Sequence, residues 1–159
     1  MYDAEGVRIG KTSGGTEYTY DYLGGKLVKM TKGSISYEFS YDEVGRPYSI
    51  RTGNATYYYV LNQQGDVAAI ISSAGQVMAE YSYNAWGKVL SATGTLAEDN
   101  PLRYRGYVYD TDLCMYYLNS RYYDPEICRF INTDSKLSTG QSVLGCNAFA
   151  YCLNDPVRY

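Results

Sequence analysis

The 159-residue sequence contains no histidine. This absence excludes Ser-His-Asp triads, Cys-His dyads, imidazole metal ligands and histidine-based pH switches. The 14 basic residues form no run and the net charge is -3, so we expect neither nucleic acid nor an anionic membrane as a partner. No segment has the roughly 18 consecutive apolar residues of a membrane span, and the N-terminal residues do not form a signal peptide. Because histidine is absent, any chemistry must use carboxylates, tyrosines, lysines or thiols.

Cysteine is sparse and its spacing is not that of a metal site. Cys114, Cys128, Cys146 and Cys152 lie in the last third of the chain, without a C-x-x-C pair. Because a zinc site would need all four thiolates, we expect no metal, and the absence of phosphate-binding glycine motifs means that we expect no cofactor. Buried thiols, or one or two disulfides, fit this spacing better, and the sequence leaves that choice open.

Tyrosine takes the place of the usual apolar residues: the chain has 21 Tyr but only 3 Phe and 1 Trp. A tyrosine ring can pack in a core while its hydroxyl reaches a partner or water, and the residue favours strands. Together with 16 Gly, this composition predicts an all-β fold with little helix.

A short pattern occurs five times: an apolar residue, Asp or Asn, two free positions and Gly. The copies are YDAEGV at Tyr2, YDYLGGKL at Tyr20, YDEVGRPY at Tyr41, LNQQGDVA at Leu61 and YNAWGKVL at Tyr83. Their glycines fall at 6, 24, 45, 65 and 87, which gives spacings of 18, 21, 20 and 22 residues. Because Asp or Asn can bind backbone N–H groups two residues later and Gly tolerates positive φ, each copy predicts a tight hairpin connection.

Tyrosines alternate with polar residues on both sides of these turns, as expected for strands with one packed face. The alternating sets are Tyr18, Tyr20 and Tyr22; Tyr37, Phe39 and Tyr41; Tyr57, Tyr59 and Leu61; and Tyr81 and Tyr83. Since an isolated hairpin is marginally stable, the copies should stack as antiparallel hairpin repeats that form part of a curled β-spiral shell. Such a sheet has open edges, so we predict that the isolated chain aggregates or oligomerises. A short helix is expected near Asn147 to Leu153, ending before Pro156.

These repeats resemble those of the YD-repeat, or rearrangement hot spot (RHS), family. The segments NPLRYRGYVYDTDLCMYYLNSRYYDPEICRFINTDS and GCNAFAYCLNDP resemble the RHS repeat-associated core domain of that family. We therefore expect YD-type repeats in residues 1–94 and a core segment in residues 95–159, at the end of a longer protein. The resemblance implies a bacterial β-shell, secreted or displayed at the cell surface, that encloses a variable C-terminal polypeptide, often a toxin. The partners would be other YD repeats, the rest of the shell and the enclosed polypeptide.

The resemblance also implies an enzymatic alternative, in which an aspartyl autoprotease in the core domain releases the enclosed polypeptide. The matching carboxylates are Asp110 and Asp124, which could divide the base and acid roles on an attacking water. Tyr109 stands where the family has an arginine, so the cation that would hold one carboxylate ionised is missing. A structural role for both aspartates is favoured, as turn carboxylates or as partners of Arg121 and Arg129.

Arginines in the same region suggest a structural seam, that is, a partly buried polar interface between packed segments. Arg103, Arg105, Arg121 and Arg129 each lie beside aromatic residues in the sequence. A planar guanidinium can stack on a tyrosine ring while it binds a carboxylate, which suits a partly buried polar interface.

A third alternative is binding of cell-wall carbohydrate. The stretch TYYYVLNQQGDVAAI resembles one unit of the aromatic repeats in choline-binding and glucan-binding modules, whose rings stack against sugars or quaternary ammonium groups. Those modules use pairs of tryptophans in each unit, whereas this chain has only Trp86. A shell wall, an autoprotease and a carbohydrate-binding repeat are thus the three functions that the sequence suggests, in that order.

Overall fold

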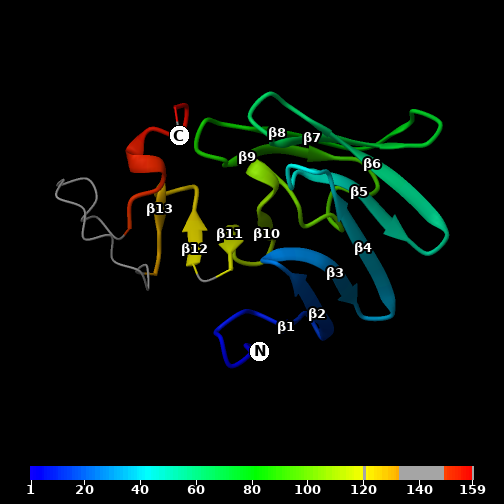
Figure 1. Ribbon diagram of the computed structural model, residues 1–159, viewed down its shortest axis with the longest axis horizontal. Coiled ribbons are helices and arrows are strands. Elements are labelled where there is room, and N and C mark those ends of the chain that lie inside the picture. Colours follow the sequence, from blue (N-terminus) through cyan, green and yellow to red (C-terminus); the bar gives the residue numbers. More distant parts are fainter. Residues whose placement is uncertain (120, 133–148, 159) are drawn as a thin grey trace.

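The computed structural model describes residues 1–119, 121–132 and 149–158, and it is built almost entirely from antiparallel strands (Figure 1). Nine strands form one sheet in sequence order: β1 (Gly10–Ser13), β2 (Thr16–Leu23), β3 (Lys26–Lys32), β4 (Ile35–Tyr41), β5 (Pro47–Thr52), β6 (Ala55–Leu61), β7 (Val67–Ser72), β8 (Val77–Tyr83) and β9 (Val89–Thr93). Four more form a smaller sheet: β10 (Val108–Asp110), β11 (Met115–Leu118), β12 (Arg121–Asp124) and β13 (Arg129–Phe130). The prediction of an all-β fold made of hairpins is confirmed.

The tyrosine-rich stretches are strands, as their alternation predicts. In β2, β4 and β8 the tyrosines of each set point to one face, where Tyr20, Tyr37 and Tyr81 are buried. They pack with aliphatic residues of neighbouring strands, such as Leu27 and Ile50, in one continuous core. Most of the polar residues between them remain exposed on the other face.

Four of the five repeated patterns form the predicted turn. In each, the glycine N–H donates to the carbonyl oxygen of Asp3, Asp42, Asn62 or Asn84 over 2.9–3.2 Å. The side-chain oxygen of the same Asp or Asn accepts hydrogen bonds from the backbone N–H groups two and four residues later. The side chain thus closes the loop, which is why Asp or Asn occupies the first position.

The second copy forms a tight hairpin connection, as predicted, but its aspartate takes no part in the turn, so the predicted role of Asp21 is wrong. Asp21 lies inside β2, and the connection to β3 is the two-residue pair Gly24-Gly25, both with positive φ. Two adjacent residues with positive φ make a tight hairpin that matches strand twist without help from a side chain. Conversely, the unpredicted loop from Ser72 to Gly75 has the same hydrogen bonds, with the serine hydroxyl in place of the carboxylate.

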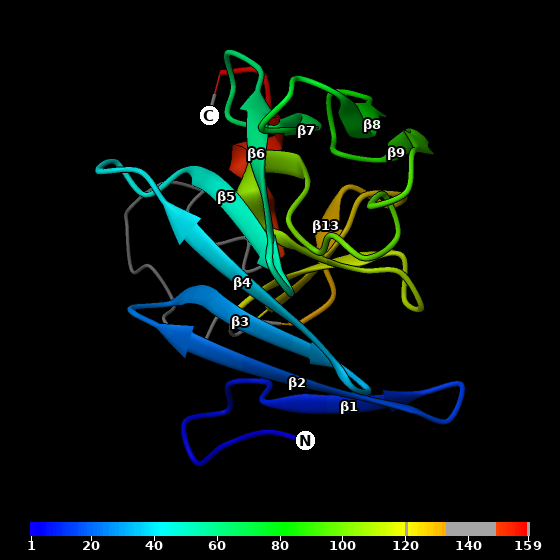
Figure 2. The same cartoon turned by 90° about the vertical axis from the view of Figure 1, so that its right-hand side faces the viewer.

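The nine-stranded sheet curls, and the four-stranded sheet lies inside the curve (Figure 2). The core segment, residues 95–159, follows β9 and is described over residues 95–119, 121–132 and 149–158. Its side chains of Leu102, Val108 and Tyr117 join the buried cluster of the large sheet. A second buried cluster, centred on Tyr116 and Tyr123, lies within the core segment. The core segment therefore fills the concave side of the repeat sheet.

The C-terminal helix is shorter than expected. It is a single 3-10 turn over Cys152–Asn154, while residues 147 and 148 of the expected helix lie outside the described residues. Cys114, Cys128 and Cys152 are free thiols, and none is fully buried, so the predictions of disulfides and of buried thiols are wrong for these three. Cys146 lies outside the described residues. In the part of the chain that the structure describes, no helix is long and apolar enough to cross a membrane.

Candidate functional site

The core segment is attached to both ends of the curled sheet, and these attachments form the candidate functional site. At the first strand lies a charged group that we call the Asp110 cluster: Arg8, Lys11, Asp110 and Asp112. At the last repeat lies a group that we call the tyrosine clamp: Tyr104, Tyr116 and Tyr123 on the turn of residues 84–87. Each joins residues that are distant in sequence.

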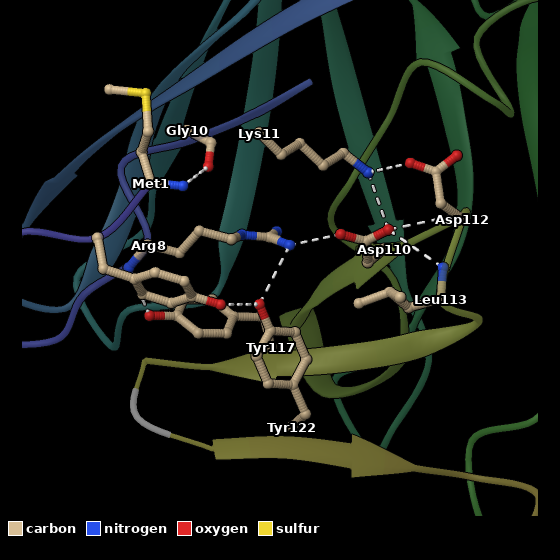
Figure 3. Close-up of polar contacts among 10 residues, drawn as sticks. Met1, Arg8, Gly10, Lys11, Asp110, Asp112, Leu113, Tyr117 and Tyr122 are labelled. Atoms are coloured by element: carbon tan, nitrogen blue, oxygen red, sulfur yellow. Dashed lines mark hydrogen bonds and ion pairs between the residues drawn. The ribbon is translucent and has the colours of Figure 1, made fainter. Parts of the chain in front are cut away.

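Asp110 is the centre of the first attachment (Figure 3). It ends β10, and its side chain is buried. One carboxylate oxygen accepts a hydrogen bond from the Arg8 guanidinium, and the other accepts one from Lys11 Nζ at 2.8 Å. The second oxygen also accepts the backbone N–H groups of Asp112 and Leu113 over 3.1 and 3.3 Å. Asp110 is therefore both a turn carboxylate, as predicted, and the anion of a buried ion pair.

Arg8 is held by aromatic rings as well as by charge. Its guanidinium carbon lies 4.6 Å from the ring centroid of Tyr20 and 4.9 Å from that of Tyr117. The Arg8 backbone N–H donates to the Tyr117 hydroxyl over 2.8 Å, so main chain and side chain are both fixed to the core segment. Cation–π contacts of this kind are strongest when the cation is shielded from water, as it is in this cluster.

The cluster keeps Asp110 ionised. Burial raises the pKa of this carboxyl, but hydrogen bonds from Lys11 and Arg8 and their positive charges outweigh burial, so the pKa lies below its usual value. The cation that the sequence does not provide at Tyr109 is thus supplied by Arg8, 102 positions earlier in the chain. An ionised carboxylate held in this way can anchor a segment or accept a proton, but it has no proton to donate.

Asp124 has a different environment. It ends β12, it is half-buried, and one carboxylate oxygen accepts the Glu126 backbone N–H at 2.8 Å. Strand β11 lies between β10, which carries Asp110, and β12, which carries Asp124. Each aspartate is the last residue of its strand, so both lie at the same end of the small sheet. None of the hydrogen bonds described joins the two carboxylates. The catalytic roles of Asp110 and Asp124 stay a prediction.

The tyrosine clamp fixes the other end of the sheet. The hydroxyls of Tyr104, Tyr123 and Tyr116 donate to three consecutive carbonyl oxygens, those of residues 85, 86 and 87, at 2.9, 2.8 and 2.7 Å. The three rings are buried and pack on one another, with centroids 5.9–6.3 Å apart between Tyr116 and each neighbour. The core segment therefore satisfies carbonyl groups of the last repeat's turn that would otherwise face water or a void.

Between the two attachments, the predicted seam of arginines is present in part. Arg103 is buried, stacks on Tyr81 and Tyr109, and donates from Nη2 to a carbonyl oxygen of residue 97 at 2.9 Å. Arg105 binds Asp66 of the fourth repeat through its backbone N–H at 3.0 Å. The guanidinium of Arg121 lies 3.7 Å from the ring centroid of Phe130. The Arg105 guanidinium lies 5.5 Å from the ring centroid of Tyr104 and 3.7 Å from the Asp66 carboxylate, so the guanidinium contacts with rings follow the prediction for Arg103, Arg105 and Arg121.

The partners of Asp110 were not predicted. Sequence reasoning proposed Arg121 and Arg129 as cations for the two aspartates, whereas Asp110 binds Arg8 and Lys11. Arg8 is the only basic residue among the first ten, and its burial is the feature that marks it. A sequence signal for this pairing would need covariation between positions 8 and 110, because no local pattern connects residues so far apart.

Of the aromatic residues considered for carbohydrate binding, Tyr59 and Trp86 face inward. Tyr59 donates from its hydroxyl to Asn100 at 2.7 Å, and Trp86 packs against the cluster around Tyr116. Tyr58 of the same stretch is half-buried, and its ring centroid lies 5.8 Å from that of the exposed Tyr48 on the neighbouring strand. Carbohydrate binding by tyrosines stays a prediction.

Comparison with known proteins agrees with this architecture. The family model described as Teneurin YD-shell matches residues 48–157. The chain belongs to the YD-shell family. The likeness to YD repeats that the sequence motifs indicate is therefore confirmed, and the match spans both the repeat sheet and the core segment.

Two curated relatives show the context in which such YD-shell sequences occur. The tRNA3(Ser)-specific nuclease WapA of Bacillus spizizenii is 34% identical over 161 residues, which cover 98% of this chain and 7% of that protein. The double-stranded DNA deaminase toxin A of Burkholderia cenocepacia is 28% identical over 189 residues, covering 96% of this chain and 13% of that protein. The chain thus spans a small part of the length of either relative.

Solved structures share the fold of this YD-shell chain. The crystal structure of TcdB2-TccC3 without its hypervariable C-terminal region aligns with a TM-score of 0.75 at 19% identity, covering 99% of this chain and 8% of that one. The structure of TcdB2-TccC3-Cdc42 aligns with a TM-score of 0.73 at 20% identity and the same coverage. The fold of this chain thus occurs within much longer chains.

Proposed function

We propose that this chain is the closing part of a β-shell that encloses the polypeptide following it, in a bacterial protein that is exported or displayed at the cell surface. In this proposal residues 1–94 form the wall and residues 95–159 form the segment that seals it. The chain has a structural role and no catalytic role in the activity of the enclosed polypeptide.

The observation that carries the proposal is the attachment of one segment to both ends of the sheet. A curled sheet of hairpins does not fix its overall curvature by strand pairing alone, because each strand contacts only its neighbours. Ion pairs at Arg8 and hydroxyl contacts at the turn of residues 84–87 hold the first and last strands to a common core. A sheet fixed at both ends is suited to bound a compartment.

The relatives support a toxin-related context. WapA is named a tRNA nuclease and another relative a DNA deaminase toxin, and this chain covers only 7% and 13% of their lengths. The solved structures include one from which a hypervariable C-terminal region is absent. We therefore assign the wall to this chain and leave the nuclease or deaminase type of activity to other parts of such proteins.

The test is protection of the following polypeptide from protease. The full-length natural protein is incubated with a broad-specificity protease, and the lifetime of its C-terminal polypeptide is followed by mass spectrometry. We expect survival far longer than that of the same polypeptide expressed alone. The variant Asp110→Arg, which places like charges against Arg8 and Lys11, should open the shell and shorten that lifetime.

The matched control is Glu43→Arg, which makes the same change of charge at an exposed turn residue of the wall. It should leave the lifetime unchanged. If the C-terminal polypeptide of the natural protein is digested as fast as its isolated form, the shell proposal is wrong.

A further inference from the structure

Two adjoining clefts at the rim of the sheet are lined by basic residues and by no acidic ones. The larger has a volume of about 350 Å³ and is lined by Lys26 and Arg105; the smaller, of about 200 Å³, adds Arg46. Lys26, Arg105 and Gly106 line both, so the two clefts are neighbours. We call them together the basic cleft. Arg46 and Arg105 each form an ion pair with a carboxylate outside the cleft lining, Asp42 at 2.8 Å and Asp66 at 3.7 Å. Lys26 therefore supplies the positive charge that distinguishes the cleft.

Lys26 carries a charge that no carboxylate neutralises within the described residues. Its Nζ donates to the Gly45 carbonyl oxygen at 2.6 Å and lies 5.3 Å from the ring centroid of Tyr41. Neither contact supplies a negative charge, and none of the ion pairs in the described part of the chain includes Lys26. A carboxylate entering the cleft would gain a charge-assisted hydrogen bond without breaking an existing ion pair.

The walls of the cleft favour a peptide over a small anion. The half-buried side chains of Tyr41 and Leu118 line the larger part, beside the backbone of the Gly24-Gly25 turn. A bare phosphate would leave these apolar side chains unused, whereas the side chains of an extended peptide alternate between polar and apolar contacts. The volume of the two parts together suits several residues of extended chain.

The position of the cleft points to the enclosed polypeptide as the ligand. Arg105 donates from Nη2 to the Pro156 carbonyl oxygen at 2.7 Å, so the last described residues of the core segment reach the cleft. In the proposed function the enclosed polypeptide follows this segment. In that proposal, the basic cleft lies beside the start of the enclosed polypeptide.

We propose that the basic cleft binds an extended acidic segment of the polypeptide that the shell encloses. This inference rests on the proposed function. It assigns Lys26 and Arg105 as the cationic contacts of the shell for its content, with Arg46 at the outer end of the cleft.

The test uses this chain and a fluorescein-labelled peptide of alternating glutamate and leucine, with binding followed by fluorescence anisotropy. We expect binding that weakens with added salt, because the contacts are between charges. A peptide of alternating lysine and leucine should bind at least about tenfold more weakly, since like charges in a cleft cost more than 1 kcal/mol. Equal binding of both peptides, or no binding of the acidic one, would overturn the proposal.

Two variants locate the site. Lys26→Glu should weaken binding of the acidic peptide by about tenfold or more. The control is Lys29→Glu, the same change at an exposed residue of β3 outside the cleft, which should alter binding by less than about twofold. Lys26→Met, which keeps the aliphatic stem, should also weaken binding and covers the case in which the glutamate variant unfolds. Equal effects at positions 26 and 29 would contradict the assignment.

Two further outcomes separate this inference from its alternatives. If millimolar inorganic phosphate displaces the acidic peptide completely, the cleft is a small-anion site and the peptide proposal is wrong. If the full-length protein protects its C-terminal polypeptide from protease but the acidic peptide does not bind, the basic cleft has another role and the shell proposal stands.

Discussion

Asp110 and Asp124 occupy the same kind of turn but have different energetic roles. Each ends a strand and accepts backbone N–H groups that follow it. Only Asp110 is buried against two cations, and only Asp110 connects the core segment to the first strand. Removing one member of a buried ion pair leaves the other charge unpaired in a medium that solvates it poorly.

We therefore predict that Asp110→Asn lowers the free energy of unfolding by about 3–5 kcal/mol, because Arg8 and Lys11 lose their common carboxylate. Asp124→Asn should cost less than about 1 kcal/mol, since a side-chain amide oxygen can still accept the Glu126 N–H. Urea unfolding followed by circular dichroism measures both. Equal losses for the two variants would show that the Asp110 cluster does not hold the sheet.

The stability that Asp110→Asn loses should depend on pH, and the direction of this dependence follows from the sign of the Asp110 pKa shift. Because the pKa of Asp110 is lowered in the folded state, its stabilisation is present above the ordinary aspartate pKa of about 3.9 and is lost as pH falls through the folded value. The free energy of unfolding of the natural chain should therefore exceed that of Asp110→Asn by a constant amount near neutral pH. This difference should shrink in acid. A difference that grows on acidification would contradict this.

Sequence reasoning identified the role of Asp110 as a turn carboxylate but not its partners. Short patterns report only local hydrogen bonds, such as those that the Asp110 carboxylate accepts from the backbone N–H groups of Asp112 and Leu113. The cations lie 102 and 99 positions away, in the first repeat, where Arg8 has the appearance of any surface arginine. Its burial is a consequence of the curl of the sheet, which no local pattern encodes.

Two repeat turns have the same hydrogen bonds but differ in how closely the core segment packs on their glycines. The turns from Asn62 to Gly65 and from Asn84 to Gly87 have the same hydrogen bonds, and their glycines have φ of +87° and +83°. A Cβ atom on Gly65 would meet no atom within 4 Å, whereas one on Gly87 would lie 2.5 Å from the Tyr104 ring. Only the second turn is part of the tyrosine clamp.

We predict that Gly65→Ala lowers the free energy of unfolding by about 1–2 kcal/mol, the cost of a side chain in the left-handed region. Gly87→Ala should cost about 1–3 kcal/mol more, because the new methyl group also displaces the buried Tyr104 ring. Thermal and urea unfolding of the two variants provide the measurement. If both lose the same amount, the close packing of the core segment on this turn is not a source of stability.

The period of tyrosines and the spacing of glycines sufficed to predict strands β2, β4, β6 and β8 and the hydrogen bonds of four of the five turns. They did not suffice at Asp21, because Gly24-Gly25 forms a tighter turn that competes with the longer loop and moves Asp21 into β2. The Ser72 loop went unpredicted because serine closes the same hydrogen bonds with a hydroxyl. In the first case the backbone conformation alone makes the turn, and in the second a hydroxyl replaces the carboxylate or amide, so a pattern written for Asp or Asn is too narrow.

Across the whole molecule, the core depends on neutral tyrosines. Hydroxyls of Tyr41, Tyr81, Tyr83 and Tyr116 donate to backbone carbonyl oxygens from buried or half-buried positions. Burial raises the pKa of these phenols above the ordinary value, and it raises the pKa of Tyr109 to about 12. A phenolate could not donate to a carbonyl oxygen, so ionisation and the folded state exclude one another in this core.

Alkali should therefore unfold the molecule as a unit. A group whose pKa is raised by folding contributes stability that is fully present below the unfolded pKa, near 10 for tyrosine, and is lost as pH rises through the folded value. We predict constant stability up to about pH 9 and cooperative unfolding above about pH 10, with tyrosinate absorbance and loss of the circular dichroism signal rising together. Several phenols contribute at once, so Tyr116→Phe alone should move the midpoint only slightly. Gradual tyrosinate formation with the strand signal intact would mean that the buried hydroxyls titrate within the folded sheet, and that the tyrosine clamp does not need its protons.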